Sequence, residues 1–537
     1  MKNKTCCLDP IDTKFIKESS ISKIVAPYLS VLVNKSLLEG YFPDSEKVGI
    51  ITPIIKANKD PKNLNSYRPV TSLSFISKLI ENVVHEQLIN FLNKNKLLPK
   101  YQSAYRYKHS TSTALLKIKN DIITLLAKGE NIIYITLDLS SAFDTILHKN
   151  LLECLENIGL CGTTLNWFQS YLSDRKIKIK VKNLESELTD LLIGIPQGGV
   201  LSPTLYSVYT ADICNLLDKH KIQYNLYADD IIIYFSTSNL KSLEEIQEKI
   251  NRLIKEIQNY MLLKHLKINP EKTEIMHICR KHRLNINLNS INVNNSEIEL
   301  KRMIKSIGFI IDMEFNMNEQ ISATIKKCNY ALHCISKIRP FLDLQATKIL
   351  INALVISKLE YNLELMQNNK QSDIEKFDKI LRKCIRLIFK LKKRESVSTY
   401  MKTLNWLPIA ERIKLKNNKI IHNSICHKTP QYIYDLFDLN ENIYHTRQNN
   451  GRSLKLTKPN SEFQRKAISV YGLTIYNEIP IDIKNSKNFN ENLRKYYLKK
   501  CFNSSSYNIF FLLMYTFIVN FVIYFICKKI IISICFS

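Results

Sequence analysis

A pair of adjacent aspartates, Asp229 and Asp230, constrains the fold of this chain more than any other feature. They stand in the stretch NLYADDIIIYF (225–235), where alternating apolar residues precede the pair and an apolar run follows it. This pattern predicts two strands joined as a hairpin, with both acids at the turn. Because adjacent carboxylates repel each other, burying either one without a partner is costly. The turn therefore either faces water or holds a divalent cation, which prefers carboxylate oxygens as ligands.

A third acid, Asp138, favours a bound cation over a turn that merely faces water. Asp138 stands near the end of the apolar, β-branched run NIIYITLDL (131–139), which predicts a strand. A buried strand carries an acid there only with a partner, so we expect the hairpin to bring Asp229 and Asp230 beside it. Three carboxylates can hold two Mg²⁺ ions, which activate an attacking hydroxyl and stabilise a leaving pyrophosphate.

Three of the chain's 11 glycines, Gly194, Gly198 and Gly199, fall within the stretch GIPQGGVLSP (194–203). In so glycine-poor a chain, this clustering indicates that the backbone closely approaches another group. The alternative is a plain turn that leads into a helix beginning near Pro203. Gln197 lies beside the glycines and can both donate and accept hydrogen bonds.

Periodicity and turn signals predict the remaining elements. A strand is expected over 48–56, a helix over 72–94 and an amphipathic helix from 321 onward. Ser141 to Asp144 fit a capping box that opens a further helix. Strands and helices alternate irregularly before a helical region, which predicts an α+β fold followed by an all-α module.

The composition narrows the choice of partner. Lys and Arg total 77 against 49 Asp and Glu, and the net charge of +28 indicates nucleic acid or an anionic membrane surface. The alternative is a solvated basic surface with no partner.

Thirteen cysteines without a Cys-x-x-Cys pair indicate reduced thiols in a reducing compartment. His422, Cys426 and His427 lack a second ligand pair, so we expect polar residues on a helix rather than a zinc site.

In this order, LDLSSAFD, GIPQGGVLSP and YADD resemble motifs A, B and C of reverse transcriptases. Further stretches resemble successive blocks of non-LTR (LINE-type) retrotransposon polymerases of the jockey-like group: TPIIK, NSYRPVTSLSFISKLIE, QSAYRYKHSTSTAL, LKINPEKT, SIGFIIDMEFN, LNWLPIAERI, RSLKLTKPN and YNEIP. Ordered blocks over about residues 8 to 502 are far more specific than YADD alone. The resemblance implies RNA-directed DNA polymerase activity, which extends a DNA primer from its 3′-hydroxyl on an RNA template with dNTPs.

The resemblance also implies roles for single residues. The metal ligands are expected to be Asp138, the Leu139 carbonyl, Asp229 and Asp230, holding two Mg²⁺ ions or Mn²⁺ in their place. The other implied roles are triphosphate binding by Lys56 and Arg68, screening of the sugar 2′ position by Phe143, nucleotide and template contacts by Gln197 and Gly198, proton donation to pyrophosphate by Lys272, and a primer grip at Ser306, Ile307, Gly308 and Phe309. Without the resemblance, Phe143 would be read as a core residue and the two lysines as surface residues.

The fold implied is a right-hand polymerase with an antiparallel palm sheet and a helical thumb. The expected regions are an N-terminal helical extension (1–45), fingers and palm (46–300), primer grip and thumb (301–400), a C-terminal helical region (401–504) and a hydrophobic tail (505–537). The basic helix expected at 378–394 either faces nucleic acid or is an ordinary solvated helix. No endonuclease domain is expected, because blocks resembling the fingers already take up the residues before Asp138.

The run IFFLLMYTFIVNFVIYFIC (509–527) is uncharged and nearly as long as a membrane span requires. It is either a membrane anchor or the translation of AT-rich flanking DNA. The expected localisation is intracellular, in the cytoplasm and nucleus, with membrane contact if the run is an anchor.

Three alternatives to an active polymerase of this group remain at this stage. The first is a catalytically silent, nucleic-acid-binding remnant of such an element. The second is a group II intron-type reverse transcriptase, against which the stretch LNWLPIAERI counts. The third is a membrane-tethered basic protein without enzymatic function.

Overall fold

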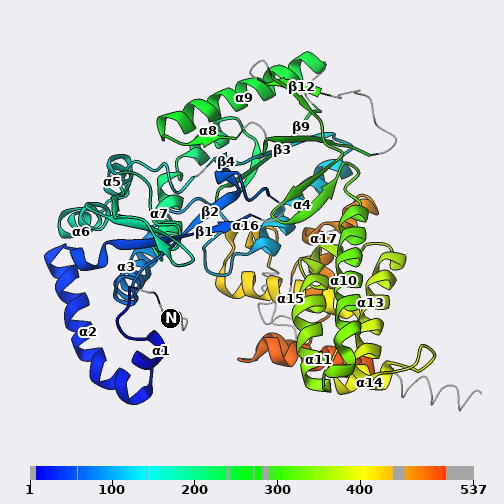
Figure 1. Ribbon diagram of the computed structural model, residues 1–537. Coiled ribbons are helices and arrows are strands. Elements are labelled where there is room, and N and C mark those ends of the chain that lie inside the picture. Colours follow the sequence, from blue (N-terminus) through cyan, green and yellow to red (C-terminus); the bar gives the residue numbers. More distant parts are fainter. Residues whose placement is uncertain are drawn as a thin grey trace, which may run out of the picture. The chain divides into compact units, whose positions relative to one another are not determined.

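The computed structural model describes residues 6, 8–56, 59–140, 142–238, 242–269, 272–280, 290–293, 296–439, 454–456 and 458–502. The chain divides into two compact units, one of residues 1–114 and 130–308 and the other of residues 115–129 and 309–537 (Figure 1). The division at 308 falls inside the stretch expected to form the primer grip. The hydrophobic run 509–527 lies outside the described residues.

The first unit is built on an antiparallel sheet in the order β11-β3-β9-β8. Its strands are β3 (Ile132–Leu137), β8 (Gln223–Tyr227), β9 (Asp230–Ser236) and β11 (Glu274–Ile278). The apolar runs of the sequence form the two central strands, β3 and β9, which are buried almost throughout. This sheet and the helices packed on it confirm the α+β expectation.

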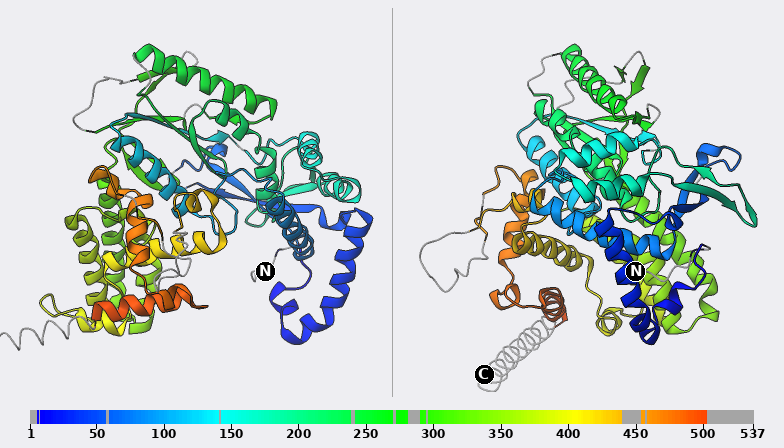
Figure 2. Two further views of the ribbon diagram at one scale, coloured as in Figure 1. Left: turned by 180° about the vertical axis from the view of Figure 1, so that it is seen from behind. Right: turned by 90° about the vertical axis from the view of Figure 1, so that its left-hand side faces the viewer.

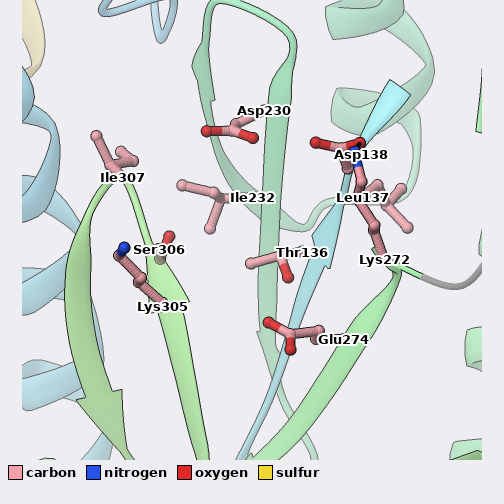
Figure 3. A pocket seen from close by; sticks show the side chains of 10 residues that line it. All are labelled: Thr136, Leu137, Asp138, Asp230, Ile232, Lys272, Glu274, Lys305, Ser306 and Ile307. Carbon is pink, nitrogen blue, oxygen red and sulfur yellow. Dashed lines mark hydrogen bonds and ion pairs between the residues drawn. The ribbon is translucent and has the colours of Figure 1, made fainter. Parts of the chain in front are cut away.

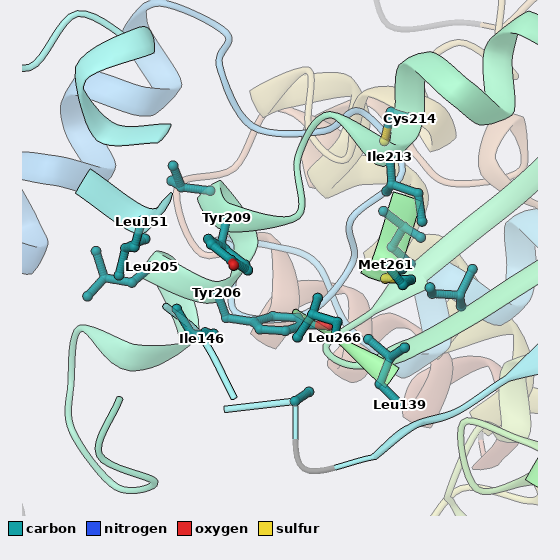
Figure 4. Close-up of a cluster of buried hydrophobic side chains, with 14 of the residues drawn as sticks. Leu139, Ile146, Leu151, Leu205, Tyr206, Tyr209, Ile213, Cys214, Met261 and Leu266 are labelled. Atoms are coloured by element: carbon teal, nitrogen blue, oxygen red, sulfur yellow. The ribbon is translucent and has the colours of Figure 1, made fainter. Parts of the chain in front are cut away.

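Helices of the first unit bury their apolar sides in one core with this sheet. They are α3 (Phe75–Lys94), α5 (His148–Asn157), α6 (Gly162–Leu172), α7 (Ser202–Tyr209), α8 (Ile213–Lys219) and α9 (Leu243–Leu263). Figure 4 shows part of this core, where Tyr206 and Tyr209 of α7 lie among Leu139, Met261 and Leu266. The expected helix start near Pro203 is confirmed, since this proline stands in the first turn of α7.

A second sheet of the first unit runs in the order β2-β1-β5-β6, with β7 also paired to β5. Its strands are β1 (Val48–Ile55), β2 (Tyr67–Ser72), β5 (Lys176–Val181), β6 (Leu184–Glu185) and β7 (Thr189–Asp190). The other short elements of the unit are α1 (Thr13–Ile16), β4 (Leu139–Ser140) paired with β10 (Lys267–Ile268), β12 (Ser290–Val293) paired with β13 (Ser296–Glu299), and β14 (Met303–Ser306). The strand expected at 48–56 is thereby confirmed.

Helix α2 (Ser19–Glu39) ends at Gly40, whose φ of +64° suits a left-handed helix cap. Among the described helices, α2 alone is long and apolar enough to cross a membrane. Length and composition are weak evidence for a span, because a core helix or a signal sequence passes the same test.

The second unit is mainly helical (Figure 2). Its elements are β15 (Phe309–Asp312), α10 (Asn318–Ile338), α11 (Leu344–Ile351), α12 (Ser357–Leu359), α13 (Gln371–Phe389), α14 (Ser398–Thr403), α15 (Ile409–His427), α16 (Gln431–Tyr434), α17 (Ile468–Asn477), α18 (Ile481–Lys484) and a helix over 489–502. Most of α4 (Thr111–Ala127) also belongs to it. Residues 378–389 of the basic helix expected at 378–394 form the second half of α13, which ends at Phe389 and buries its apolar side against α10 and α11.

Two local expectations have different outcomes. His422 lies on α15 as expected, buried and stacked on Phe489 with ring centroids 3.5 Å apart. The prediction of a helix opening at the capping box 141–144 is wrong, because residues 142–144 form a turn and α5 begins only at His148. The carbonyls of Phe143 and Ile146 instead accept hydrogen bonds from the amides of Ile195 and Gly194. Pairing with a distant loop thus overrides the local helix-start signal.

Candidate active site

The hairpin predicted from NLYADDIIIYF is present and carries the two aspartates at its turn. β8 and β9 pair up to Tyr227 and Asp230, which leaves Ala228 and Asp229 as the two turn residues. Ala228 has a φ of +54°, which a residue with a Cβ atom rarely adopts. Asp230 opens β9, and both acids are half-buried.

A cavity of about 300 Å³ lies beside this turn (Figure 3). Its walls come from the ends of β3, β9, β11 and β14, and its lining residues are Thr136, Leu137, Asp138, Asp230, Ile232, Lys272, Glu274, Lys305, Ser306 and Ile307. In Figure 3 the carboxylates of Asp138 and Asp230 lie at the same end of the cavity, from neighbouring strands. Sequence reasoning missed Glu274 and Lys305, which carry no motif signal of their own.

The three acids act on one another electrostatically. Burial raises the pKa of Asp229 above its ordinary value, and the charge of Asp138 adds to the increase. Burial also raises the pKa of Asp230, to about 6, with further contributions from Asp229 and Asp138. Carboxylates whose ionised forms are disfavoured in this way gain stability from a nearby positive charge.

Lys272 supplies one such charge. Its Nζ lies 2.6 Å from Oδ2 of Asp138, and its charge lowers the pKa values of Asp229 and Asp230. Within the part of the chain that the structure describes, no three His, Cys, Asp or Glu side chains are grouped closely enough to hold a metal ion. The donor chemistry nevertheless fits a divalent cation, since the three carboxylates repel one another and hard oxygens suit Mg²⁺ or Mn²⁺.

The glycine-rich stretch approaches other backbone closely, as its composition predicts. Gly198 has a φ of +141°, and a Cβ atom built on it would lie 2.2 Å from the carbonyl oxygen of Thr71 in β2. A Cβ on Gly194, at φ +86°, would lie 2.8 Å from the carbonyl oxygen of Asp144. The amide of Thr71 donates to the Gln197 carbonyl at 2.8 Å, so this loop is fixed to the edge of β2.

The side chain of Gln197 is bound to Asp144. Its Nε2 lies 2.8 Å from both carboxylate oxygens of Asp144. Burial raises the pKa of Asp144, and the bond from Gln197 opposes that increase. From the sequence, Asp144 was expected only to cap a helix, and nothing in its local pattern indicates this distant partner.

A further buried acid holds the same loop from the other side. Glu81 of α3 is fully buried and accepts hydrogen bonds from the amides of Val200 and Leu201, where α7 begins. Burial raises the pKa of Glu81, and the charge of buried Arg175 opposes the increase. Glu81 closes the stretch SKLIE, so its place in a motif block is the only sequence signal that marks it.

Three further residues were predicted to bind the nucleotide, and each lies on a different element. Phe143 is half-buried in the turn after β4, with its ring centroid 5.0 Å from that of Tyr206. Arg68 is exposed on β2, and its charge lowers the pKa of Asp229. Lys56 follows β1, and its Nζ donates to the carbonyl of Asn65 at 2.9 Å. Leu139 opens β4 with its side chain buried.

The stretch expected to grip the primer forms a tight turn. Ser306 ends β14, and its hydroxyl accepts a hydrogen bond from buried Tyr134 of β3 at 2.9 Å. Ile307 and Gly308 follow at φ +48° and +76°. Phe309 is buried at the start of β15, in the second unit. Ser306 and Ile307 thus line the cavity that holds Asp138 and Asp230.

Residues 56–311 match a protein-family model described as "Reverse transcriptase (RNA-dependent DNA polymerase)". The "Probable RNA-directed DNA polymerase from transposon BS" of Drosophila melanogaster is 29% identical over 314 residues, 56% of this chain and 33% of that protein. The "RNA-directed DNA polymerase from mobile element jockey" of Drosophila funebris is 26% identical over 324 residues, 58% of this chain and 34% of that protein. The chain thus matches about a third of the length of these curated relatives. Among solved structures, the apo telomerase from Candida tropicalis is 14% identical, with a TM-score of 0.39 over 78% of this chain and 74% of that one.

Proposed function

We propose that this chain, whose residues 56–311 match the reverse transcriptase family model, is the RNA-directed DNA polymerase of a non-LTR retrotransposon. One observation carries the proposal: Asp138 and Asp230 line one cavity, although they lie far apart in the sequence, and the charge of Asp138 also acts on Asp229, the neighbour of Asp230 in the turn. The substrates would be dNTPs, an RNA template and a DNA primer with a free 3′-hydroxyl.

The three acids, with the Leu139 carbonyl, are the residues that would hold two divalent cations, Mg²⁺ or Mn²⁺. When bound, such ions make the primer hydroxyl a better nucleophile and stabilise the charge of the leaving pyrophosphate. Burial and the neighbouring acids Asp229 and Asp138 raise the pKa of Asp230, which supports this assignment because a bound cation stabilises the ionised carboxylate.

Three basic residues would act on the triphosphate. Arg68 stands on β2 of the second sheet, and Lys56 directly follows β1 of that sheet. Arg68 can bind two phosphate oxygens at once. Lys272 would donate a proton to the leaving pyrophosphate after its ammonium group is released from Asp138. Gln197 and Gly198 would contact the nucleotide and the template strand, and residues 306–309 the primer.

Primer extension tests the proposal. Purified protein with Mg²⁺ and dTTP should extend oligo(dT) on poly(rA), and chelation of the metal should stop the reaction. Template–primer affinity should fall steeply as salt rises, because phosphate contacts release counterions. Tight binding of poly(rA)/oligo(dT) without any extension would instead support a catalytically silent remnant.

Replacing Phe143 with alanine tests the sugar-screening role. The Phe143 ring is held against Tyr206 and can exclude a 2′-hydroxyl by overlap alone. We expect Phe143→Ala to raise kcat/KM for rCTP relative to dCTP by about 10- to 200-fold. If Phe143 is only a packing residue, its loss lowers stability by about 3–5 kcal/mol and depresses both substrates together.

A matched control separates these outcomes. Phe168 of α6 is a fully buried aromatic residue of the same unit. Phe168→Ala should lower the melting temperature but leave the ratio of rCTP to dCTP use unchanged. A Phe143→Ala enzyme with the wild-type ratio would reject the sugar-screening role.

A further inference from the structure

A short segment outside the motifs LDLSSAFD, GIPQGGVLSP and YADD runs along the edge of the β8–β9 hairpin, which carries Asp229 and Asp230. The carbonyl of Tyr101 accepts from the Leu226 amide at 3.0 Å, and the amide of Ser103 donates to the Leu226 carbonyl at 2.8 Å. Gln102 pairs with Leu226 in a parallel bridge between these two bonds. Residues 101–103, here termed the hairpin strap, therefore extend the sheet beyond β8.

The hairpin strap is closely packed against β8. Gln102 and Ser103 are each 1% exposed, and the Ser103 hydroxyl accepts a hydrogen bond at 3.3 Å from Nδ2 of Asn225, which is itself fully buried. The ring of Tyr101 meets that of Tyr224 edge to face, with centroids 5.1 Å apart. Such buried polar and aromatic contacts fix one register between the hairpin strap and the hairpin.

Gln102 reaches past β8 to the catalytic turn itself. Its Oε1 accepts hydrogen bonds from the amide of Ala104 at 3.1 Å and from the amide of Ala228 at 3.3 Å. Ala228 is the turn residue with φ +54°, directly before Asp229. A left-handed conformation at a non-glycine residue persists only when its surroundings hold it there. Here the hydrogen bond from the Ala228 amide to the buried Gln102 oxygen stabilises this conformation.

We propose that Gln102 is a positioning residue for the metal site, holding the Ala228–Asp229 turn in the geometry in which Asp229 and Asp138 share a cation. The inference rests on the proposed function, since it assigns Gln102 to the same site. Without this acceptor, the Ala228 amide is left without that bond and the turn relaxes toward an unstrained conformation. Asp229 then leaves its place, although no metal ligand has been changed.

Three variants test this role. Gln102→Met keeps the length of the side chain but removes the oxygen that accepts from Ala228. Gln102→Glu restores that oxygen, because a carboxyl oxygen at the same position can accept from the Ala228 amide whether or not the group is protonated. Ser103→Ala serves as the control, since it removes the buried contact to Asn225 on the same hairpin strap and leaves the Ala228 amide untouched.

The readouts are the Mg²⁺ concentration for half-maximal primer extension, Mn²⁺ affinity by electron paramagnetic resonance, and the melting temperature. We expect Gln102→Met to weaken metal affinity by about 10- to 100-fold, the range typical of residues that orient metal ligands. Gln102→Glu should recover most of that loss, and Ser103→Ala should lower the melting temperature alone. If Gln102→Met does not fold, Gln102→Asn takes its place, because it keeps a polar amide but its shorter side chain withdraws the oxygen from the Ala228 amide. It should then weaken metal affinity, whereas Ser103→Ala should not.

Wild-type metal affinity in folded Gln102→Met protein would overturn the inference, and so would an equal loss in Ser103→Ala. Failure of the proposed function is distinguishable from both outcomes. In that case the wild-type protein extends no primer at any Mg²⁺ concentration, whereas the Mn²⁺ measurement still compares the variants without need of activity.

Discussion

Replacing Asp229 with asparagine is expected to abolish primer extension, lowering kcat by about a hundred- to a thousandfold or more, while duplex binding persists. Asparagine keeps the shape of the side chain and removes one of the three negative charges that the site brings together. The loss should therefore fall on the chemical step rather than on the affinity for template and primer.

The same substitution is expected to stabilise the metal-free protein. Folding raises the pKa of Asp230 from 3.8 to about 6. Between these two pH values, the folded chain keeps a proton on Asp230 that the unfolded chain has lost. Stability therefore falls as pH rises through this window, and at neutral pH the ionised acids oppose folding. Asp229 contributes to that repulsion, so its removal should raise the melting temperature in the presence of a chelator.

Primer extension and thermal unfolding of both proteins, with and without Mg²⁺, check these two expectations. Asp190→Asn is a suitable control, since Asp190 is an exposed acid on β7 of the same unit. Mg²⁺ should stabilise the wild type and the control more than it stabilises Asp229→Asn. Full polymerase activity in Asp229→Asn would reject the assignment of Asp229 as a metal ligand.

Sequence patterns predict the elements of this fold because each pattern is local. Alternation around the paired acids predicts the β8–β9 hairpin, the β-branched run before Asp138 predicts β3, and Pro203 marks the start of α7. The convergence of the acids also follows from a local argument, since a buried strand cannot carry an unpartnered carboxylate.

The residues that hold the site in place could not be predicted in this way. Gln197 binds Asp144 across 53 residues, Glu81 binds the Val200 amide across 119, and Gln102 binds the Ala228 amide across 126. No periodicity links partners so distant, and each side chain has ordinary local alternatives. The failed capping box has the same cause, because a tertiary contact claims the carboxylate that the local pattern assigns to a helix end.

Replacing Gly198 with alanine is expected to disrupt both folding and catalysis. The new Cβ atom would lie 2.2 Å from the Thr71 carbonyl oxygen, at a φ of +141° that L side chains rarely adopt. The oxygen cannot retreat easily, since Thr71 is paired with Ile51 in the sheet and bonded to Gln197. Overpacking and backbone strain each cost about 1–3 kcal/mol, and both apply at this position. The loop must then move, and it takes Gln197 away from Asp144.

Comparison with Gly162→Ala separates the effect of the close approach from that of the left-handed backbone. Gly162 opens α6 at φ +56°, and a Cβ atom built on it would meet nothing within 4 Å. It therefore carries only the penalty of a left-handed backbone, about 1–2 kcal/mol. Chemical unfolding of both variants should show the larger loss in Gly198→Ala, and only that variant should lose dNTP incorporation. Equal losses of stability with normal KM for dNTP in both would mean that the loop yields to the added methyl group, and the contact with Thr71 would then have no part in placing Gln197.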